Sequence, residues 1–376
     1  MREIGVGLIG TGFMGKCHAL AYGAMVPIFG GPLRPKLLKL ADADPSIGAQ
    51  RAAEFGFAEA VTDWRAIIAD PAIALVSITT PNALHREMAE AALAAGKHVW
   101  CEKPMGLTLA DAESMAAAAQ TATGRTQLGY NYIRNPLIAE AKRLIEAGEL
   151  GRITHFRGAV DEDYMADGDI PWSWRCRLAD AGLGALGDIM VHLVSLAHTL
   201  MGGIDSLTAQ IETIHKTRPL PDRPGESGAV ENEDAAQALV RFASGASGVL
   251  ATSRAAWGRK NRLGFEIHGT KGTLIYDQER MNELQFFSAS GDASTRGFRT
   301  ILSGPVHAPY GAFCPAPGHG LGFNDLKVIE LNGLLRAIDG QADPLAVDFA
   351  AGLAIERVIH AMVTSAQTGT WIGLPA

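Results

Sequence analysis

Apolar residues in the first third of the chain form short runs separated by segments with helical character. The runs end in glycine or polar residues, as buried parallel strands do, and cover residues 3–9, 36–41, 74–79, 97–101 and 126–130. Asp44 and Pro45 are typical of a helix N-cap and a first helical residue, and Gly96 of a helix end. Strands alternating with helices predict a parallel sheet with crossover helices.

One segment of this first part departs from the alternation. Residues 19–35 are longer than a minimal crossover helix and contain Pro27, Pro32 and Pro35 together with a Gly-Gly pair. Proline and glycine interrupt helices, so we expect a loop here, with the second strand beginning only at Lys36.

From residue 152 onward the hydrophobic pattern is that of antiparallel strands at short spacing. Strands are expected over 152–161, 205–215, 234–242, 246–255, 262–268, 272–277 and 283–288, and helices over 188–201, 323–339 and 348–367. Prolines and mixed charges predict an exposed loop over 217–234, and a long excursion is expected over 289–320.

These patterns predict an α/β protein with two different sheets. We expect an N-terminal Rossmann domain with a parallel sheet over 1–130. A C-terminal α+β domain with a large open, mostly antiparallel sheet is expected over 131–345, for substrate binding and oligomerisation. Residues 346–376 are expected to form a helix and tail that pack back near the domain junction.

The first apolar run leads into the motif Gly10-Thr11-Gly12-Phe13-Met14-Gly15. In a dinucleotide-binding βαβ unit, the first glycine allows the tight turn. The second lets the backbone approach a pyrophosphate, and the third lets the helix pack on the strand. The pyrophosphate would lie at the helix N-terminus. The competing interpretation is a glycine-rich turn without a ligand.

Asp42 follows the second strand, where a carboxylate can bind both ribose hydroxyls of NAD and repel the 2′-phosphate of NADP. The next residue is Ala43, not an arginine, which favours NAD as the cofactor. The alternative is that Asp42 is only a turn residue.

Charge and composition narrow the class of protein. The 376 residues carry a formal net charge of −7 with no basic cluster, which argues against nucleic acid and membrane surfaces as partners. No apolar run is expected to reach the roughly 18 residues that a membrane span needs. The first residues enter a strand directly, which leaves no room for a signal peptide. The four cysteines are scattered, as in a reduced, cytoplasmic protein without a zinc site.

Polar residues follow two further strands, where parallel sheets bind ligands. Thr80, Pro81, Asn82 and His85 follow one strand, and Glu102, Lys103 and Pro104 the next. His85 fits either a crevice residue or a capping histidine. Lys103 is expected to project towards the nicotinamide.

Asp188 and His192 are four residues apart, which places them on one face of a helix. Oxidation of a hydroxyl needs a base near neutrality, usually histidine, and a lysine can stabilise the developing alkoxide. The simpler alternative is a helix cap and a core histidine. Two such residues without further ligands make a poor metal site, so no metal is expected.

Taken together, the Gly10–Gly15 motif, Thr80-Pro81-Asn82 with His85, Glu102-Lys103-Pro104 and Gly187-Asp188 with His192 resemble the glucose–fructose oxidoreductase / inositol dehydrogenase / rhizopine-catabolism family. The resemblance covers essentially the whole chain. It implies a Rossmann domain, an open-sheet domain, and NAD-dependent oxidation of a secondary or anomeric hydroxyl of a cyclic polyol or sugar, such as an inositol or an aldopyranose.

The resemblance also implies residue roles. Lys103 would contact the reacting oxygen, Asp188 would be its carboxylate partner, and His192 the general acid/base. The cofactor-binding residues would be Gly10, Thr11, Gly12, Phe13, Met14, Gly15, Asp42, Thr80, Pro81, Asn82, His85, Glu102, Lys103 and Asn131. The substrate-binding residues would be Lys103, Tyr130, Arg134, Asp161, Trp174, Arg175, Asp188, His192 and His319.

Met190 and Ser195 depart from the residues common in the family, which affects substrate details more than the reaction. Two other functions remain open. One is a glycoside hydrolase of the same fold that regenerates its NAD, and the other is a cofactor-binding regulator. An apolar open sheet face would favour a homo-oligomer, with a tetramer preferred and a dimer as the alternative.

Overall fold

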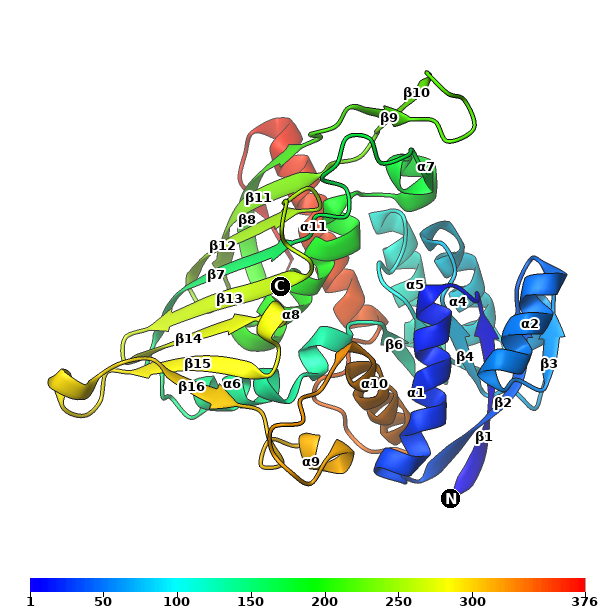
Figure 1. The fold of residues 1–376 in the computed structure, drawn as a ribbon, viewed down its shortest axis with the longest axis horizontal. Helices are drawn as coiled ribbons and strands as arrows, with labels where there is room; N and C mark the ends of the chain where they lie inside the picture. Colours follow the sequence, from blue (N-terminus) through cyan, green and yellow to red (C-terminus); the bar gives the residue numbers. More distant parts are fainter. Residues whose placement is uncertain (376) are drawn as a thin grey trace. The chain divides into compact units, whose positions relative to one another are not determined.

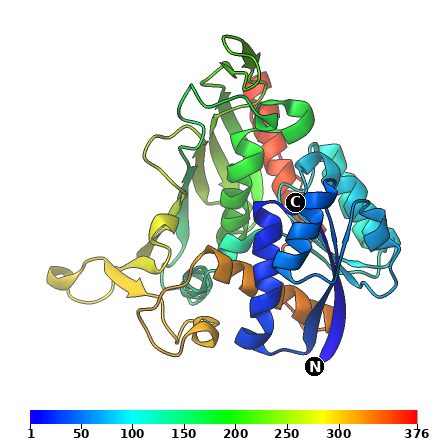
Figure 2. The same ribbon diagram turned by 45° about the vertical axis from the view of Figure 1, so that its right-hand side comes forward.

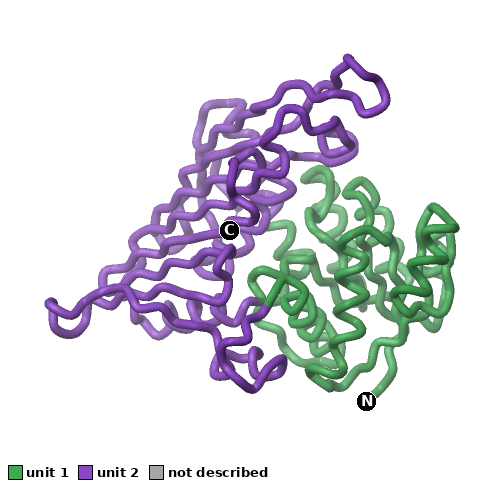
Figure 3. Tube along the Cα trace, in the orientation of Figure 1, with its two compact units in different colours: residues 1–134, 322–354 green, residues 135–321, 355–376 purple. Residues whose placement is uncertain are grey.

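The computed structural model describes residues 1–375, which fold into two units (Figure 3). Unit 1 comprises residues 1–134 and 322–354, and unit 2 comprises residues 135–321 and 355–376. Residues 322–354 thus join the N-terminal part of the chain. The helix α11 (Phe349–Thr368) begins in unit 1 and ends in unit 2.

Unit 1 contains a six-stranded parallel sheet in the order β3-β2-β1-β4-β5-β6 (Figure 1). The strands are β1 (Arg2–Ile9), β2 (Leu33–Ala41), β3 (Glu59–Val61), β4 (Leu75–Ile78), β5 (His98–Cys101) and β6 (Thr126–Leu128). The helices are α1 (Phe13–Phe29), α2 (Pro45–Phe55), α3 (Arg65–Ile68), α4 (His85–Ala94), α5 (Leu109–Thr121) and α10 (Phe323–Ile338), with single turns η1 (Asn82–Leu84) and η2 (Asn131–Arg134). This strand order is that of a Rossmann fold, as predicted.

Helix α10 returns from late in the chain to lie along α1 (Figures 1 and 2). The rings of Phe13 and Phe323 stack there, with their centroids 5.9 Å apart. The Rossmann unit is therefore completed by residues more than 300 positions from its first strand.

The expected loop over 19–35 is wrong. Helix α1 continues to Phe29 with Pro27 inside it, and β2 starts at Leu33. Pro27 lies in the last turn of α1, where few hydrogen bonds remain to be lost, and the N–H of Gly30 closes the helix on Val26 O at 2.9 Å.

Unit 2 contains a nine-stranded sheet in the order β16-β15-β14-β13-β7-β12-β11-β8-β17 (Figure 1). Its pairs are antiparallel except β7 with β12. The strands are β7 (Ile153–Asp161), β8 (Ile204–Glu212), β11 (Ala235–Phe242), β12 (Ser247–Ser253), β13 (Arg262–Gly269), β14 (Gly272–Asp277), β15 (Glu283–Ser288), β16 (Arg299–Leu302) and β17 (Ile372–Gly373). This agrees with the predicted open, mostly antiparallel sheet.

Helices α6 (Pro136–Glu146) and α8 (Val191–Met201) pack against one face of this sheet. The other short helical elements of unit 2 are α7 (Leu178–Ala181), α9 (Tyr310–Phe313), η3 (Trp174–Cys176), η4 (Leu186–Met190), η5 (Gln278–Arg280) and η6 (Ala293–Thr295). Along β7, Phe156, Gly158 and Val160 are buried beneath helices. A Cβ at Gly158 would lie 2.6 Å from Leu193 Cδ1, so this glycine allows α8 to approach the strand closely.

The expected exposed loop over 217–234 is only partly correct. It contains a small antiparallel ribbon, β9 (Thr217–Pro219) and β10 (Ser227–Ala229), and its last residues are buried. Asn232, Glu233 and Asp234 are at most 4% exposed. Their polar groups find partners in distant parts of unit 2, which a local pattern of charge and proline does not reveal.

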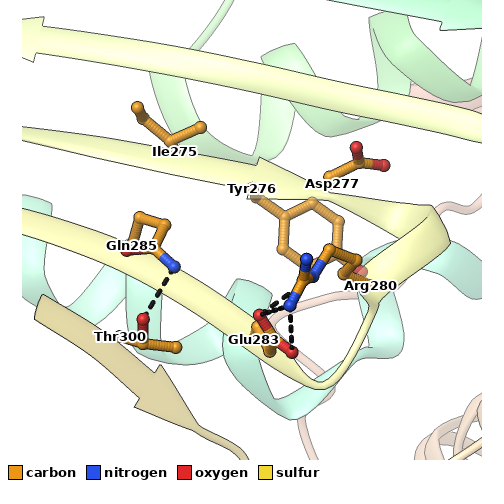
Figure 4. A pocket seen from close by; sticks show the side chains of 7 residues that line it. All are labelled: Ile275, Tyr276, Asp277, Arg280, Glu283, Gln285 and Thr300. Atoms are coloured by element: carbon orange, nitrogen blue, oxygen red, sulfur yellow. Dashed lines mark hydrogen bonds and ion pairs between the residues drawn. The ribbon is translucent and has the colours of Figure 1, made fainter. Parts of the chain in front are cut away.

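The opposite face of the nine-stranded sheet mixes apolar and polar side chains, so the expectation of an apolar face is only partly met. Leu239 and Val249, paired across β11 and β12, are 52% and 40% exposed there. The same face carries the exposed Arg157, the half-buried Glu266, and the stacked rings of His155 and His268, 4.4 Å apart. A hollow among β14, β15 and β16 has polar walls that bond to one another (Figure 4). Its lining residues are Ile275, Tyr276, Asp277, Arg280, Glu283, Gln285 and Thr300, none of which belongs to the predicted site. A homo-oligomer stays a prediction.

Two helical stretches reach the length and mean hydropathy of a membrane span, contrary to the expectation that none is long enough. They are Leu178–Met201 and Phe349–Thr368, with mean hydropathies of 1.4 and 1.2. Core helices of folded domains pass the same test, and 78% of the first window is buried.

Candidate active site

The glycine motif forms the turn between β1 and α1. Gly10 has a φ of +93°, and a Cβ there would lie 2.7 Å from Thr79 O. A Cβ at Gly15 would collide with Gly10 O, so this glycine keeps α1 close to the strand end. Gly12 is the N-cap, and a Cβ there would meet nothing within 4 Å. The open backbone at Gly12 leaves the helix N-terminus accessible to an anion.

Asp42 follows β2 and is half-buried beside this turn. Its Oδ2 accepts a hydrogen bond from the Thr11 hydroxyl, and its Oδ1 accepts one from Asp44 N at 3.0 Å. Asp44 caps α2 by accepting from the N–H groups of Ser46 and Ile47. Asp44 is therefore the residue that caps α2, while the carboxylate of Asp42 is oriented next to the glycine turn. Phe13 is 71% exposed at the same turn, and Met14 is half-buried.

His85 links two turns at the carboxyl end of the parallel sheet. Its Nδ1 lies 2.9 Å from Pro104 O and its Nε2 lies 3.0 Å from Thr80 O. The side chain is fully buried, and burial lowers the pKa of His85, so the neutral ring donates to one of these carbonyls. This geometry supports a positioning role for His85 between the Thr80-Pro81-Asn82 and Lys103-Pro104 turns, rather than direct contact with a ligand.

Glu102 ends β5 and belongs to a buried cluster of side chains. It accepts hydrogen bonds from Lys327 Nζ at 2.6 Å and His18 Nε2 at 2.9 Å. Lys327 also donates to Glu330 at 2.9 Å, and Glu330 accepts from Trp100 Nε1 at 3.1 Å. We call these residues, His18, Trp100, Glu102, Lys327 and Glu330, the ionic cluster. It ties α1 and α10 to the strand end that carries Lys103.

Charge pairing sets the protonation states in the ionic cluster. Burial would raise the pKa of Glu102, but Lys327 and His18 outweigh burial and hold it well below its usual range. Burial opposes the charged form of Lys327, yet Glu102 and Glu330 raise its pKa. Burial lowers the pKa of His18 to about 4 and raises the pKa of Glu330. Lys327 and Glu102 thus form a buried ion pair at the residue that precedes Lys103, which is itself half-buried.

The segment after β6 is held within unit 1. Arg134 Nη1 donates to both oxygens of Asp343, at 2.8 and 2.9 Å, and Arg134 is only 4% exposed. Asn131 Nδ2 donates to Phe323 O at 3.5 Å, and Tyr130 is 1% exposed. Because the guanidinium of Arg134 is paired with the carboxylate of Asp343, the geometry favours a structural role for Arg134 over substrate binding.

Asp188 and His192 lie on consecutive turns in unit 2. Asp188 belongs to η4, a π-helical turn, and His192 to the first turn of α8. π-helical turns are rare and are frequently found at functional sites. Asp188 Oδ2 accepts a hydrogen bond from the Tyr164 hydroxyl at 2.6 Å, and His192 is 7% exposed.

Residues 231–234, which we call the clamp, hold the backbone of the segment that leads to Asp188. Glu231 accepts from Leu178 N at 2.9 Å, and Asn232 Nδ2 donates to Arg175 O and Gly182 O. Glu233 Oε1 accepts from Leu186 N at 2.8 Å, at the start of η4. Burial raises the pKa of Glu233 despite these bonds. Asp234 is paired with Arg254 at 2.8 Å, with both side chains almost fully buried.

The remaining predicted substrate residues are not all brought together. The guanidinium of Arg175 lies 4.6 Å from the centre of the Trp174 ring, and Trp174 is 36% exposed. Asp161 lies on the sheet face opposite α8, paired with Arg262 at 3.4 Å, and burial raises its pKa. His319 is exposed, with Nδ1 3.1 Å from Pro317 O in its own loop. The structure therefore associates neither Asp161 nor His319 with Asp188.

Sequence reasoning missed Tyr164, the clamp, and Lys327 with Glu330. Tyr164 is 24 residues from Asp188, and no spacing rule connects them. The charges of Lys327 and Glu330 interrupt an otherwise apolar stretch of α10, a signal that they face inward with a buried partner. Among residues 1–375, no three His, Cys, Asp or Glu side chains are grouped so as to hold a metal ion.

Two family models match the chain. The oxidoreductase family with an NAD-binding Rossmann fold matches residues 4–130, and the GFO/IDH/MocA C-terminal domain matches residues 138–275. The matches cover most of both units.

Several characterised proteins are similar over long stretches. Levoglucosan dehydrogenase of Pseudarthrobacter phenanthrenivorans is 41% identical over 388 residues, covering 100% of this chain and 99% of that protein. Inositol 2-dehydrogenase of Rhizobium meliloti is 27% identical, covering 77% of this chain and 80% of that protein. A structure of levoglucosan dehydrogenase in complex with NADH and levoglucosan superimposes with a TM-score of 0.95 at 41% identity, covering 100% of both chains.

Proposed function

Because the chain belongs to the GFO/IDH/MocA family of oxidoreductases, with an NAD-binding Rossmann fold, we propose that it oxidises a ring hydroxyl of a pyranose or anhydrosugar with NAD. The observation that carries this proposal is the full-length similarity to levoglucosan dehydrogenase. Similarity to inositol 2-dehydrogenase covers less of the chain at lower identity, so a sugar is favoured over an inositol.

Residues of unit 1 support NAD as the cofactor in this proposal. The open N-terminus of α1 at Gly12 provides N–H groups for a pyrophosphate. The Asp42 carboxylate, oriented by Thr11 and Asp44 N, can accept hydrogen bonds from ribose hydroxyls and repels a 2′-phosphate.

The catalytic groups are proposed from their chemistry. The hydride leaves the carbinol carbon for the nicotinamide ring, while the hydroxyl proton passes to His192, so that the alcohol becomes a ketone (or a lactone at an anomeric carbon). Lys103 stabilises the developing alkoxide, and Asp188 is the carboxylate partner of Lys103. The location of Asp188 on a π-helical turn supports a functional over a purely capping role.

The test is an assay of levoglucosan, other anhydrosugars, aldopyranoses and inositols with NAD, followed by NADH absorbance. Substrate consumption with no net NADH would instead indicate the hydrolase reaction. No reaction of any kind would contradict both enzymatic functions.

The same assay tests His192. His192→Ala is expected to lower kcat by about 10²–10⁴-fold, the usual contribution of a general base, while NAD affinity stays nearly unchanged. His198→Ala is the matched control, because His198 is a half-buried histidine of the same helix outside the proposed site. It should lower the melting temperature without lowering turnover per folded molecule. A His192→Ala variant that is destabilised but fully active would remove His192 from the mechanism.

A further inference from the structure

Tyr164 contacts the proposed catalytic carboxylate directly. Its hydroxyl donates to Asp188 Oδ2 at 2.6 Å, a short bond of the kind formed between a hydroxyl and a charged oxygen. Burial, with the adjacent Asp188, raises the pKa of Tyr164 well above its usual value. The phenol therefore stays protonated and remains a donor. One oxygen of Asp188 is occupied by it.

The ring of Tyr164 is itself held in place. It packs against a small apolar core of Met165, Cys176 and Val230. The backbone beside it is fixed by Met165 N, which donates to Arg254 O at 2.9 Å, and by Met165 O, which accepts from Arg218 Nη2 at 2.6 Å. Arg218 is fully buried. The hydroxyl is thus presented to Asp188 by a rigid part of unit 2, as preorganised support for a reacting group requires.

The backbone of Asp188 is restrained by a different part of the chain. Glu233 of the clamp accepts from Leu186 N, and Asp188 N donates to Gly184 O at 2.9 Å. These bonds fix where the π-helical turn runs, and they act on the backbone. The bond from the half-buried Tyr164 acts on the carboxylate itself.

We propose that Tyr164 is a positioning residue for the oxidation, which locks Asp188 in one rotamer and stabilises its ionised form. This inference rests on the proposed function. Tyr164 acts through Asp188, because its bond to Oδ2 restrains the orientation of the carboxylate. Removing the hydroxyl removes this restraint, which lowers kcat without changing how NAD binds.

The experiment is Tyr164→Phe, which removes one oxygen and keeps the ring in its apolar core. We expect kcat per folded molecule, with folding checked by near-UV circular dichroism, to fall about 10-fold or more. The KM for NAD should stay within about 2-fold of the unmodified protein, since the cofactor motif lies in unit 1. A fall of this size is what loss of one hydrogen bond to a charged group produces.

Tyr276→Phe is the matched control. Tyr276 is a buried tyrosine of the same unit, and its hydroxyl donates to Gln278 Oε1 at 2.7 Å, away from Asp188. It should lower the melting temperature comparably and leave kcat unchanged. A structural role for Tyr164 would make the two variants behave alike.

A double-mutant cycle separates the inference from the proposed function. If Tyr164 acts through Asp188, Tyr164→Phe should add little further loss in an Asp188→Asn background. An active unmodified protein whose Tyr164→Phe variant keeps full kcat, or loses equally with and without Asp188, overturns the inference alone. An unmodified protein that oxidises none of the sugars or polyols overturns the proposed function and this inference with it.

Discussion

The two units stabilise their candidate residues with different kinds of buried polar network. In unit 1 the ionic cluster joins side chain to side chain, and Lys327 pairs with two carboxylates, one that follows β5 and one on α10. In unit 2 the clamp joins side chains mainly to backbone N–H and C=O groups around η4 and α7. The first network depends on charge, whereas the second, apart from the ion pair of Asp234 with Arg254, depends on hydrogen-bonding geometry. This difference predicts that a neutral substitution of similar size strongly destabilises the protein in the ionic cluster and has little effect in the clamp.

The largest effect is expected from breaking the ionic cluster. Lys327→Met removes the cation that pairs with Glu102 and Glu330, and leaves carboxylates buried without a counter-charge. The free energy of unfolding should fall by roughly 3–5 kcal/mol, measured by denaturant unfolding. Lys36→Met is the control, since Lys36 pairs with Glu3 at 3.2 Å on the surface and should cost at most about 1 kcal/mol. Equal losses in both variants would show that the cluster contributes no special stability.

The ionic cluster also shows what sequence could and could not predict. The turn from Gly10 to Gly15 and the polar ends of the parallel strands were predicted because each is encoded within a few residues. The amphipathic helix over 323–339 was predicted as well, but not that it completes unit 1 or that Lys327 is fully buried. That depends on the partner Glu102, which is 225 residues away. No local pattern records such a distance.

The same reasoning applies to the second network. Prolines and charges over 217–234 predicted an exposed loop, yet Arg218, Glu233 and Asp234 are buried because each bonds to distant groups. Asp188 and His192 could be selected from their spacing, but Tyr164 could not. The proposed catalytic residues follow local motifs here, whereas the residues that contact them come from remote segments.

A loss of unfolding free energy of intermediate size is expected when the pH falls, and one histidine in each unit should contribute to it. Burial lowers the pKa of His18, in unit 1, and of His198, in unit 2, to about 4 in each case. The unfolded chain binds a proton at each near pH 6.5, so stability is present above pH 6.5 and is lost as the pH falls from 6.5 towards 4. Each histidine should account for roughly 2 kcal/mol of the loss at pH 5.

His198→Leu tests the contribution of His198 to this loss, because the buried Nε2 of His198 has no hydrogen-bond partner within residues 1–375. The difference in unfolding free energy between pH 7 and pH 5 should shrink by roughly 2 kcal/mol in the variant. An unchanged difference would mean that His198 titrates normally in the folded protein.

The smallest effect is expected from Glu233→Gln, which sharpens the contrast between the networks. Glu233 acts as an acceptor for Leu186 N at 2.8 Å, and the amide oxygen of glutamine can accept the same bond. Burial raises the pKa of Glu233, so the charged form is unfavourable in the folded state. Removing the charge should therefore not destabilise the protein. We expect the unfolding free energy to change by less than about 1 kcal/mol. Glu233→Ala, which removes the acceptor, should cost about 1–3 kcal/mol because Leu186 N is left buried without a bond. If Glu233→Gln were as damaging as Glu233→Ala, the clamp would depend on charge as the ionic cluster does, and the distinction between the two units would fail.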